Sequence, residues 1–115
     1  MRITTRRILP AALALAIGVM SPAAAAAQDV KRGQEVYAAQ KCSVCHSIAG
    51  TGSKMNPLDG LGAKMSADDI RKWIVNPAEM TKQTKSTKKP PMPAKYDKLP
   101  AADLDALVAY LHSLK

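Results

Sequence analysis

The sequence predicts a small all-α domain with three main helices, and three observations support this prediction. Near the C-terminus, leucine and valine recur at the spacing of three and four residues that places them on one helix face. Residues 66–77 begin with a serine and two aspartates and end with Asn-Pro, which are start and stop signals of a helix. No segment of the chain is a convincing strand.

The N-terminal residues have the pattern of a secretory signal peptide. Arg2, Arg6 and Arg7 precede an apolar run of thirteen residues, Ile8–Met20. A membrane span needs about 20 residues, so an uncleaved anchor is the weaker interpretation. A run of small residues then leads to Ala27, after which we expect cleavage.

This interpretation divides the chain into a cleaved signal peptide, residues 1–27, and one domain, residues 28–115. Export places the protein outside the cytosol, most simply in a bacterial periplasm, with no stable membrane insertion after cleavage.

The chain has 17 Lys and Arg against 9 Asp and Glu, and it stays basic without the three signal arginines. A basic surface suits nucleic acid, an anionic membrane or an acidic protein. Because no nucleic-acid motif is present, we expect acidic protein partners.

Residues 29–40 are predicted to form the first helix. Val30, Val36 and Tyr37 fall near one face of it, with Gly33 in the middle. A glycine inside a helix costs about 1 kcal/mol relative to alanine, so its presence needs a reason. We expect another helix to pack closely against Gly33, because glycine lets two backbones approach. Simple tolerance of glycine near a frayed helix start is the alternative.

The sequence Cys42-Ser43-Val44-Cys45-His46 follows this helix and is the attachment motif of a c-type haem. Each thiol would add to one haem vinyl group, and His46 would bind the iron through a ring nitrogen. A disulfide, a thiol redox centre and half of a zinc site are the alternatives. With only two cysteines and two histidines in the chain, a zinc site is short of ligands. A haem would also supply the core that a small domain with no Phe and one Trp lacks.

Residues 47–64 are predicted to be a loop, because they hold four glycines and an Asn-Pro turn signal. Leu58 and Leu61 are its apolar anchors. A loop of this length inside a small domain needs something to wrap, and a haem edge would serve.

The second helix is predicted to begin at Ser66, which caps it, and to end before Pro77. Ile70, Trp73 and Ile74 form its inward face. The last helix is predicted to begin at Pro100 or Ala101, since proline suits the first turn. Its apolar face consists of leucines and one valine: Leu104, Leu107, Val108, Leu111 and Leu114.

Residues 78–98 are predicted to be a lysine-rich linker that contains the second axial ligand of the iron, Met92. Three prolines surround this methionine and fix its backbone, which suits a ligand better than a core residue. Ligation by His46 and Met92 would close the iron to solvent ligands and raise its reduction potential. Met80 is the second choice of ligand, and His112 is the bis-histidine alternative. The two other methionines outside the signal peptide are Met55 in the glycine-rich loop and Met65, which can pack on Ile70.

Taken together, these motifs resemble a class I cytochrome c over nearly all of residues 28–115. The resemblance rests on an ordered set of residues: Gly33, Tyr37, Cys42-Ser43-Val44-Cys45-His46, Asn56-Pro57-Leu58, Trp73-Ile74-Val75-Asn76-Pro77, Pro91-Met92-Pro93, Leu107 and Tyr110. It implies a small cytochrome c fold, with three main helices and loops wrapped around one covalent haem c. It also implies that the first and last helices cross at near right angles, so that Gly33 and Tyr37 meet Leu107 and Tyr110.

The resemblance assigns roles to two further residues. Pro57 is similar to the proline whose carbonyl accepts the imidazole N–H of the haem histidine, a bond that fixes the tautomer. Trp73 is similar to the aromatic residue that packs on the methionine side of the haem. Family members often carry a tyrosine there, with its hydroxyl near the sulfur.

The predicted function is that of a periplasmic single-haem c-type cytochrome, which carries one electron between redox proteins and is not an enzyme. A dehydrogenase, reductase or oxidase with an acidic docking surface would be its partner. Lysines near the haem edge would attract such a surface, although a generally solvated lysine surface is the alternative. The lysines concerned are Lys41, Lys54, Lys82, Lys85, Lys88, Lys89 and Lys95.

Three other functions stay open from the sequence. The chain can be the electron-transfer subunit of a larger oxidoreductase. It can be a haem-based ligand-binding or peroxidase-like protein, although no distal acid–base residue is evident. It can also be a haem-free thiol oxidoreductase.

Overall fold

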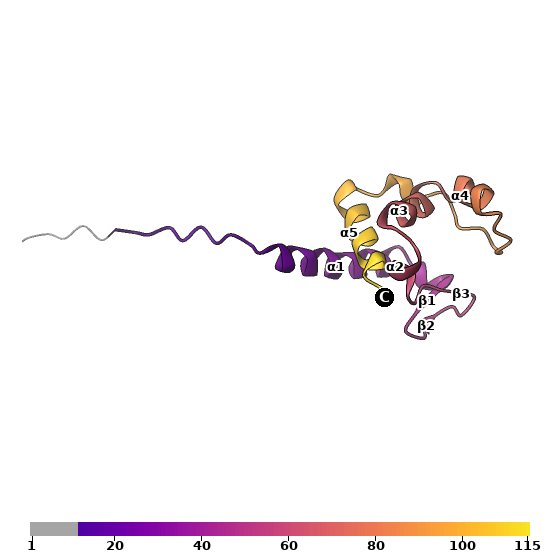
Figure 1. The fold of residues 1–115 in the computed structure, drawn as a ribbon, viewed down its shortest axis with the longest axis horizontal. Helices are drawn as coiled ribbons and strands as arrows, with labels where there is room; N and C mark the ends of the chain where they lie inside the picture. The colour runs from indigo at the N-terminus through magenta and orange to yellow at the C-terminus, as the bar shows by residue number, and fades with distance from the viewer. Residues whose placement is uncertain (1–11) are drawn as a thin grey trace, which may run out of the picture.

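The computed structural model describes residues 12–115 of the chain (Figure 1). The arginines of the predicted signal peptide and the start of its apolar run lie outside the described residues. The helices are α1 (Pro22–Ala39), α2 (Leu61–Lys64), α3 (Ala67–Val75), α4 (Pro77–Thr84) and α5 (Ala101–His112), with two 3₁₀ turns, η1 (Cys42–Val44) and η2 (Tyr96–Lys98). The predicted all-α fold class is confirmed, because strands account for only a few residues.

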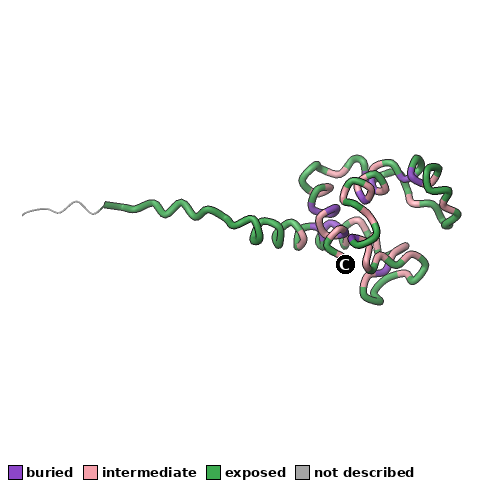
Figure 2. The backbone as a smooth tube through the Cα atoms, viewed as in Figure 1, coloured by how far each residue is buried: buried purple, intermediate pink, exposed green. Residues whose placement is uncertain are grey.

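Helix α1 begins earlier than the predicted start at Asp29. Pro22 occupies its first turn, and the Ser21 hydroxyl accepts a hydrogen bond from the amide of Ala24 at 3.3 Å. The alanines that follow are the best helix formers, so the helix extends without tertiary contacts. All residues from Ala12 to Asp29 are exposed, and this part of the chain projects away from the packed domain (Figure 2). No helix within residues 12–115 is long and apolar enough to cross a membrane.

The packed domain is organised by the contact between α1 and α5, which run steeply across each other in Figure 1. Gly33 of α1 is buried at this contact, and a Cβ atom there would clash with the Ala106 carbonyl and the Tyr110 Cβ. The expected close packing at Gly33 is therefore confirmed. Next to it, the rings of Tyr37 and Tyr110 meet edge to face, with centroids 5.9 Å apart.

Helix α3 packs against α5 and completes the hydrophobic core. Ser66 caps α3 as predicted, because its hydroxyl accepts from the Asp69 amide at 3.1 Å. The core brings residues from α1, α3, η2 and α5 together: Val36, Ile70, Ile74, Tyr96, Leu107, Val108 and Leu111. This core borders the cavity described below on one side.

The segment predicted to be a linker holds most of helix α4, so that prediction is wrong for residues 78–84. Asn76 ends α3, and its side-chain oxygen then accepts from the Glu79 amide at 3.4 Å and caps α4. Pro77 occupies the first turn of α4, where its missing N–H costs nothing. The Asn-Pro pair therefore acts both as the stop of one helix and as the start of the next. The rest of the segment, from Lys85 to Lys95, is irregular.

The segment predicted to be a loop without strands contains a small sheet. Strand β1 (His46–Ile48) pairs antiparallel with β2 (Thr51–Gly52) and parallel with β3 (Asn56–Pro57). The strands are too short to produce an alternating pattern, which is why the sequence does not reveal them. The sheet extends directly from the Cys42–His46 motif and fixes the path of the chain beside it.

Candidate functional site

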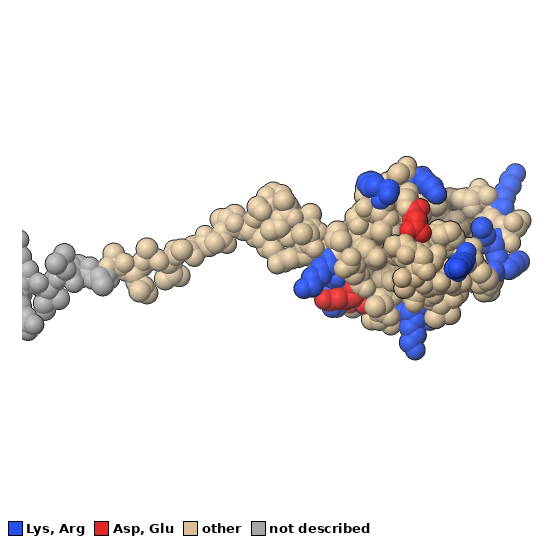
Figure 3. All heavy atoms as spheres, turned by 90° about the horizontal axis from the view of Figure 1, so that it is seen from below, with Lys and Arg blue, Asp and Glu red and all other residues tan. Residues whose placement is uncertain are grey.

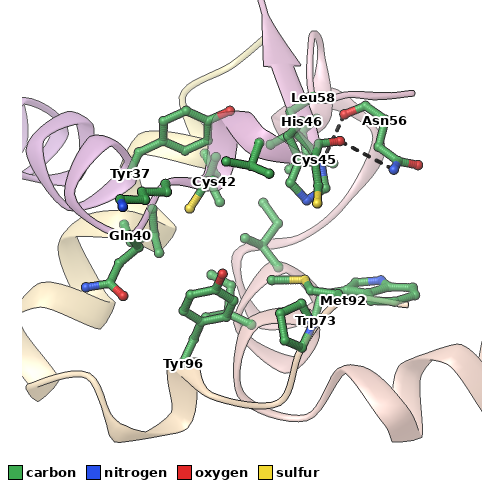
Figure 4. Close-up of a pocket in the computed structure, with 18 of the residues that line it drawn as sticks. Tyr37, Gln40, Cys42, Cys45, His46, Asn56, Leu58, Trp73, Met92 and Tyr96 are labelled. Atoms are coloured by element: carbon green, nitrogen blue, oxygen red, sulfur yellow. Dashed lines mark hydrogen bonds between the residues drawn. The ribbon is translucent and has the colours of Figure 1, made fainter. Parts of the chain in front are cut away.

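A cavity of about 900 Å³ opens between α3, α5, the Cys42–His46 segment and the proline-rich segment (Figure 4). This volume lies near the upper end of the roughly 300–1,000 Å³ found for small-molecule and cofactor sites. All six residues singled out from the sequence line it: Cys42, Cys45, His46, Pro57, Trp73 and Met92. They come from segments that are separated by up to fifty positions in the chain, so the fold alone brings them together.

The two thiols lie on the first wall of the cavity, at the 3₁₀ turn η1 that follows α1. Neither Cys42 nor Cys45 forms a disulfide. The Cys45 amide donates to the Cys42 carbonyl at 3.2 Å, so a single tight turn separates the two side chains. Burial raises the pKa of the Cys42 thiol above its usual range, which favours the protonated form. Because of this turn, both thiols lie on the same side of the cavity, where they can reach one edge of a bound ligand.

His46 lies on the same wall, and its ring is oriented by a backbone carbonyl. Its Nδ1 donates to the carbonyl oxygen of Asn56 at 3.0 Å. Because a carbonyl only accepts, Nδ1 must carry the proton, and Nε2 keeps a free electron pair for a metal ion. The family resemblance assigned this acceptor to Pro57, and that assignment is wrong. Pro57 lines the cavity and pairs with Ser47 in the sheet, while the residue before it supplies the carbonyl.

Met92 lies across the cavity from His46, on the wall formed by the proline-rich segment (Figure 4). Of the other three methionines of residues 28–115, only Met65 also lines the cavity. Met80 is buried within α4 and Met55 is exposed, and neither contributes to the cavity wall. The geometry therefore favours Met92 as the partner of His46 and makes Met65, rather than Met80, its nearest competitor.

Aromatic side chains complete the cavity. Trp73 of α3 lies on the Met92 side in Figure 4, as the resemblance implies, and Tyr96 of η2 lies beneath. Tyr37 lines the opposite side, where burial raises the pKa of its hydroxyl to about 12. Within residues 12–115, the Tyr37 hydroxyl and the Trp73 indole nitrogen are the buried side-chain polar atoms without a hydrogen-bond partner. The polypeptide alone therefore leaves polar atoms of its cavity walls unsatisfied.

Three exposed lysines, Lys41, Lys88 and Lys95, contribute to the lining of the cavity. The ion pairs of the described chain use Arg32, Arg71 and Lys72 as cations. The seven lysines predicted to lie near the haem edge are therefore exposed and free of carboxylate partners within residues 12–115. Figure 3 shows cationic side chains projecting from several edges of the domain, with few acidic ones on that face.

Two alternatives lose support from this arrangement. His112 lies at the C-terminal end of α5 and does not line the cavity, so bis-histidine ligation has no geometric basis here. Residues 12–115 contain no cluster of three or more His, Cys, Asp or Glu side chains that could hold a metal ion, which counts against a zinc site.

The residues present fit a covalently bound haem. Two free thiols and an imidazole with an available Nε2 lie on one wall, and a thioether lies on the other. Apolar side chains from α3 and α5 line the space between them: Leu61, Ile70, Ile74, Leu107 and Leu111. This donor set is that of a haem iron with one nitrogen and one sulfur ligand.

A comparison with protein families found one match, to the family model described as Cytochrome c, over residues 30–115. The matched range contains every residue of the cavity wall. Neither the curated proteins nor the solved structures gave a match to the chain.

Proposed function

Because the chain belongs to the cytochrome c family and binds haem c covalently as that family does, we propose that it is a single-haem electron carrier of the periplasm. The observation that carries the proposal is the placement of Met92 across the cavity from His46. With His46 and Met92 both bound to the iron, no position would stay open for a substrate, which favours electron transfer over catalysis.

The haem supplies a one-electron Fe(III)/Fe(II) couple, and the protein residues control its environment. Thioether bonds from Cys42 and Cys45 would keep the cofactor from dissociating after export. His46, held by the Asn56 carbonyl, would give nitrogen ligation in a fixed orientation. Met92 would give sulfur ligation, which favours Fe(II) and would raise the potential. Because the flanking prolines restrict the Met92 backbone, little rearrangement accompanies a change of oxidation state.

The proposed location rests on the N-terminal sequence and on burial. Cleavage after Ala27 would remove exposed residues from the described part of the chain, and the first buried residue of α1 is Gly33. The packed domain would therefore stay intact after processing. Redox proteins with acidic surfaces are the proposed partners, because Lys41, Lys88 and Lys95 line the cavity and have no carboxylate partner within residues 12–115.

Visible spectroscopy of the protein expressed with haem-attachment machinery tests this proposal. We expect a low-spin c-type spectrum in both oxidation states and the weak long-wavelength band that a thioether ligand gives ferric haem. The reduced protein should not bind carbon monoxide at neutral pH, since no position on the iron is open. A high-spin spectrum with rapid carbon monoxide binding would point to a ligand-binding protein instead. Absence of covalent haem would contradict both functions.

Electron transfer to an acidic redox partner should slow steeply as salt is added. Between low and about 0.2 M ionic strength, we expect the bimolecular rate to fall about ten-fold or more, because salt screens charges beyond roughly 10 Å. Lys88→Glu should reduce the rate at low salt and flatten its salt dependence. Lys31→Glu is the matched control, because Lys31 is exposed on α1 and does not line the cavity. Stopped-flow kinetics would measure both, and equal effects of the two variants would contradict a docking surface at the cavity mouth.

A further inference from the structure

Asn56 makes two different hydrogen bonds to the Cys42–His46 segment. Its backbone carbonyl accepts from Nδ1 of His46 at 3.0 Å, and its side-chain Nδ2 donates to the Cys45 carbonyl at 3.4 Å. Figure 4 shows both bonds. One residue of β3 thus contacts both the histidine that would bind the iron and the cysteine immediately before it.

The Asn56 carbonyl needs such support, because β3 is only two residues long. Its register pairs Asn56 with His46 and Pro57 with Ser47, in parallel orientation. Pro57 restricts the backbone of the residue before it to extended conformations, which limits the directions that the Asn56 carbonyl can take. The side-chain bond then holds Asn56 against the turn that carries the cysteines.

The Cys45 carbonyl also needs this bond. Cys45 follows the last residue of η1, at a position where carbonyls lack a partner inside the turn. The Ser43 carbonyl nearby accepts from the Ser53 amide at 2.9 Å, and the Ser47 carbonyl accepts from the Leu58 amide at 2.8 Å. The side-chain amide of Asn56 therefore completes a set of three bonds by which residues 53–58 hold residues 43–47 in place.

We propose that the Asn56 side chain is a positioning residue for the iron-binding histidine. By holding its own carbonyl close to His46 Nδ1, it sets the strength of that bond and, through it, the reduction potential. This inference rests on the proposed function, because it concerns His46 as the axial ligand.

The direction of the effect follows from the charge on the imidazole. Donation from Nδ1 to a carbonyl makes the ring a stronger electron donor through Nε2. A stronger donor stabilises Fe(III) relative to Fe(II) and lowers the potential. If the Asn56 carbonyl moves away, the ring becomes a weaker donor, and the potential should rise.

The test compares Asn56→Leu, of similar size but without hydrogen bonds from its side chain, with Asn56→Ser, a smaller change that preserves folding more easily. Both holoproteins should show an upward shift of the midpoint potential. In the reduced state, NMR should show about five-fold faster solvent exchange of the His46 Nδ1 proton, as expected for loss of one ordinary hydrogen bond. The ¹⁵N shift of His46 Nδ1 should also change.

Asn76→Ala is the matched control. The Asn76 side chain accepts a hydrogen bond of the same length, 3.4 Å, from the Glu79 amide and so caps α4. Asn76 does not line the cavity. The control should lower the melting temperature and leave the potential and the His46 proton unchanged. If the Asn56 variants behave like this control, the side chain is merely structural, and the proposal is wrong. The wild-type spectrum decides the proposed function separately, so the two failures can be told apart.

Discussion

Replacing Met92 with alanine should remove the sulfur ligand from the iron. We expect the ferric protein to lose its weak long-wavelength band and become high-spin or water-ligated, while the covalent haem stays attached through Cys42 and Cys45. The midpoint potential should fall by on the order of 100 mV or more, since axial ligands set haem potentials over a span of about 0.8 V. The reduced variant should also bind carbon monoxide, because one position on the iron becomes open. Spectroscopy and redox titration would measure these changes.

Two further methionine variants serve as controls for this result. Met80→Ala creates a cavity in a buried part of α4 and should cost about 2–5 kcal/mol of stability without changing the spectrum. Met65→Ala alters the cavity wall itself and should keep the band. Retention of the band in Met92→Ala, combined with its loss in Met65→Ala, would move the ligand to Met65. Loss of the band only in Met80→Ala would require the structure around α4 to be different.

Replacing Gly33 with alanine should strongly destabilise the domain. The added Cβ would clash with the Ala106 carbonyl and the Tyr110 Cβ, so α1 and α5 would have to move apart. Overpacking of this kind typically costs 1–3 kcal/mol and occasionally more, against about 1 kcal/mol gained from the helix propensity of alanine. We expect a net loss of about 2 kcal/mol, because backbone atoms of α5 cannot rotate away. For a domain of this size, that loss lowers the melting temperature by roughly 8–16 °C.

The neighbouring exposed position provides the control. Gln34 lies on the solvent side of α1, so Gln34→Ala should be more stable than Gln34→Gly by about 1 kcal/mol, the ordinary difference in helix propensity. Thermal unfolding of the oxidised holoprotein, followed by circular dichroism, would give the melting temperatures of wild type and Gly33→Ala and of Gln34→Ala and Gln34→Gly. A Gly33→Ala variant as stable as the wild type would show that the helices do not approach as closely as the structure indicates.

The sequence predicted several elements correctly because their signals are local. Ser66 marks the start of α3 and Ala101 the start of α5, as caps and prolines near helix ends indicate. Helix α4 was missed because its start signal, Asn76-Pro77, coincides with the stop signal of α3. The sheet beside His46 was missed because two-residue strands leave no periodic pattern.

Some close contacts of the fold had no signal in the sequence. Gly62 donates its amide to the Leu114 carbonyl at 2.6 Å, and a Cβ atom at this position would clash with the His112 carbonyl. In the sequence it is one of several glycines of a long loop, and no periodicity separates it from Gly60, which has open space around it. Only the position of the end of α5 explains why a glycine is needed there.

A short local motif is enough to predict the covalent chemistry of the site. Cys42, Cys45 and His46 lie within five residues, so one turn of backbone brings them to the same cofactor, whatever the rest of the chain does. The fold sets which groups from distant segments face this motif across the cavity. It placed Met92 rather than Met80 across the cavity from His46, and it made Asn56 rather than Pro57 the acceptor for His46. Those choices depend on the directions in which α4 and β3 run, and such directions are set by packing and pairing between distant segments.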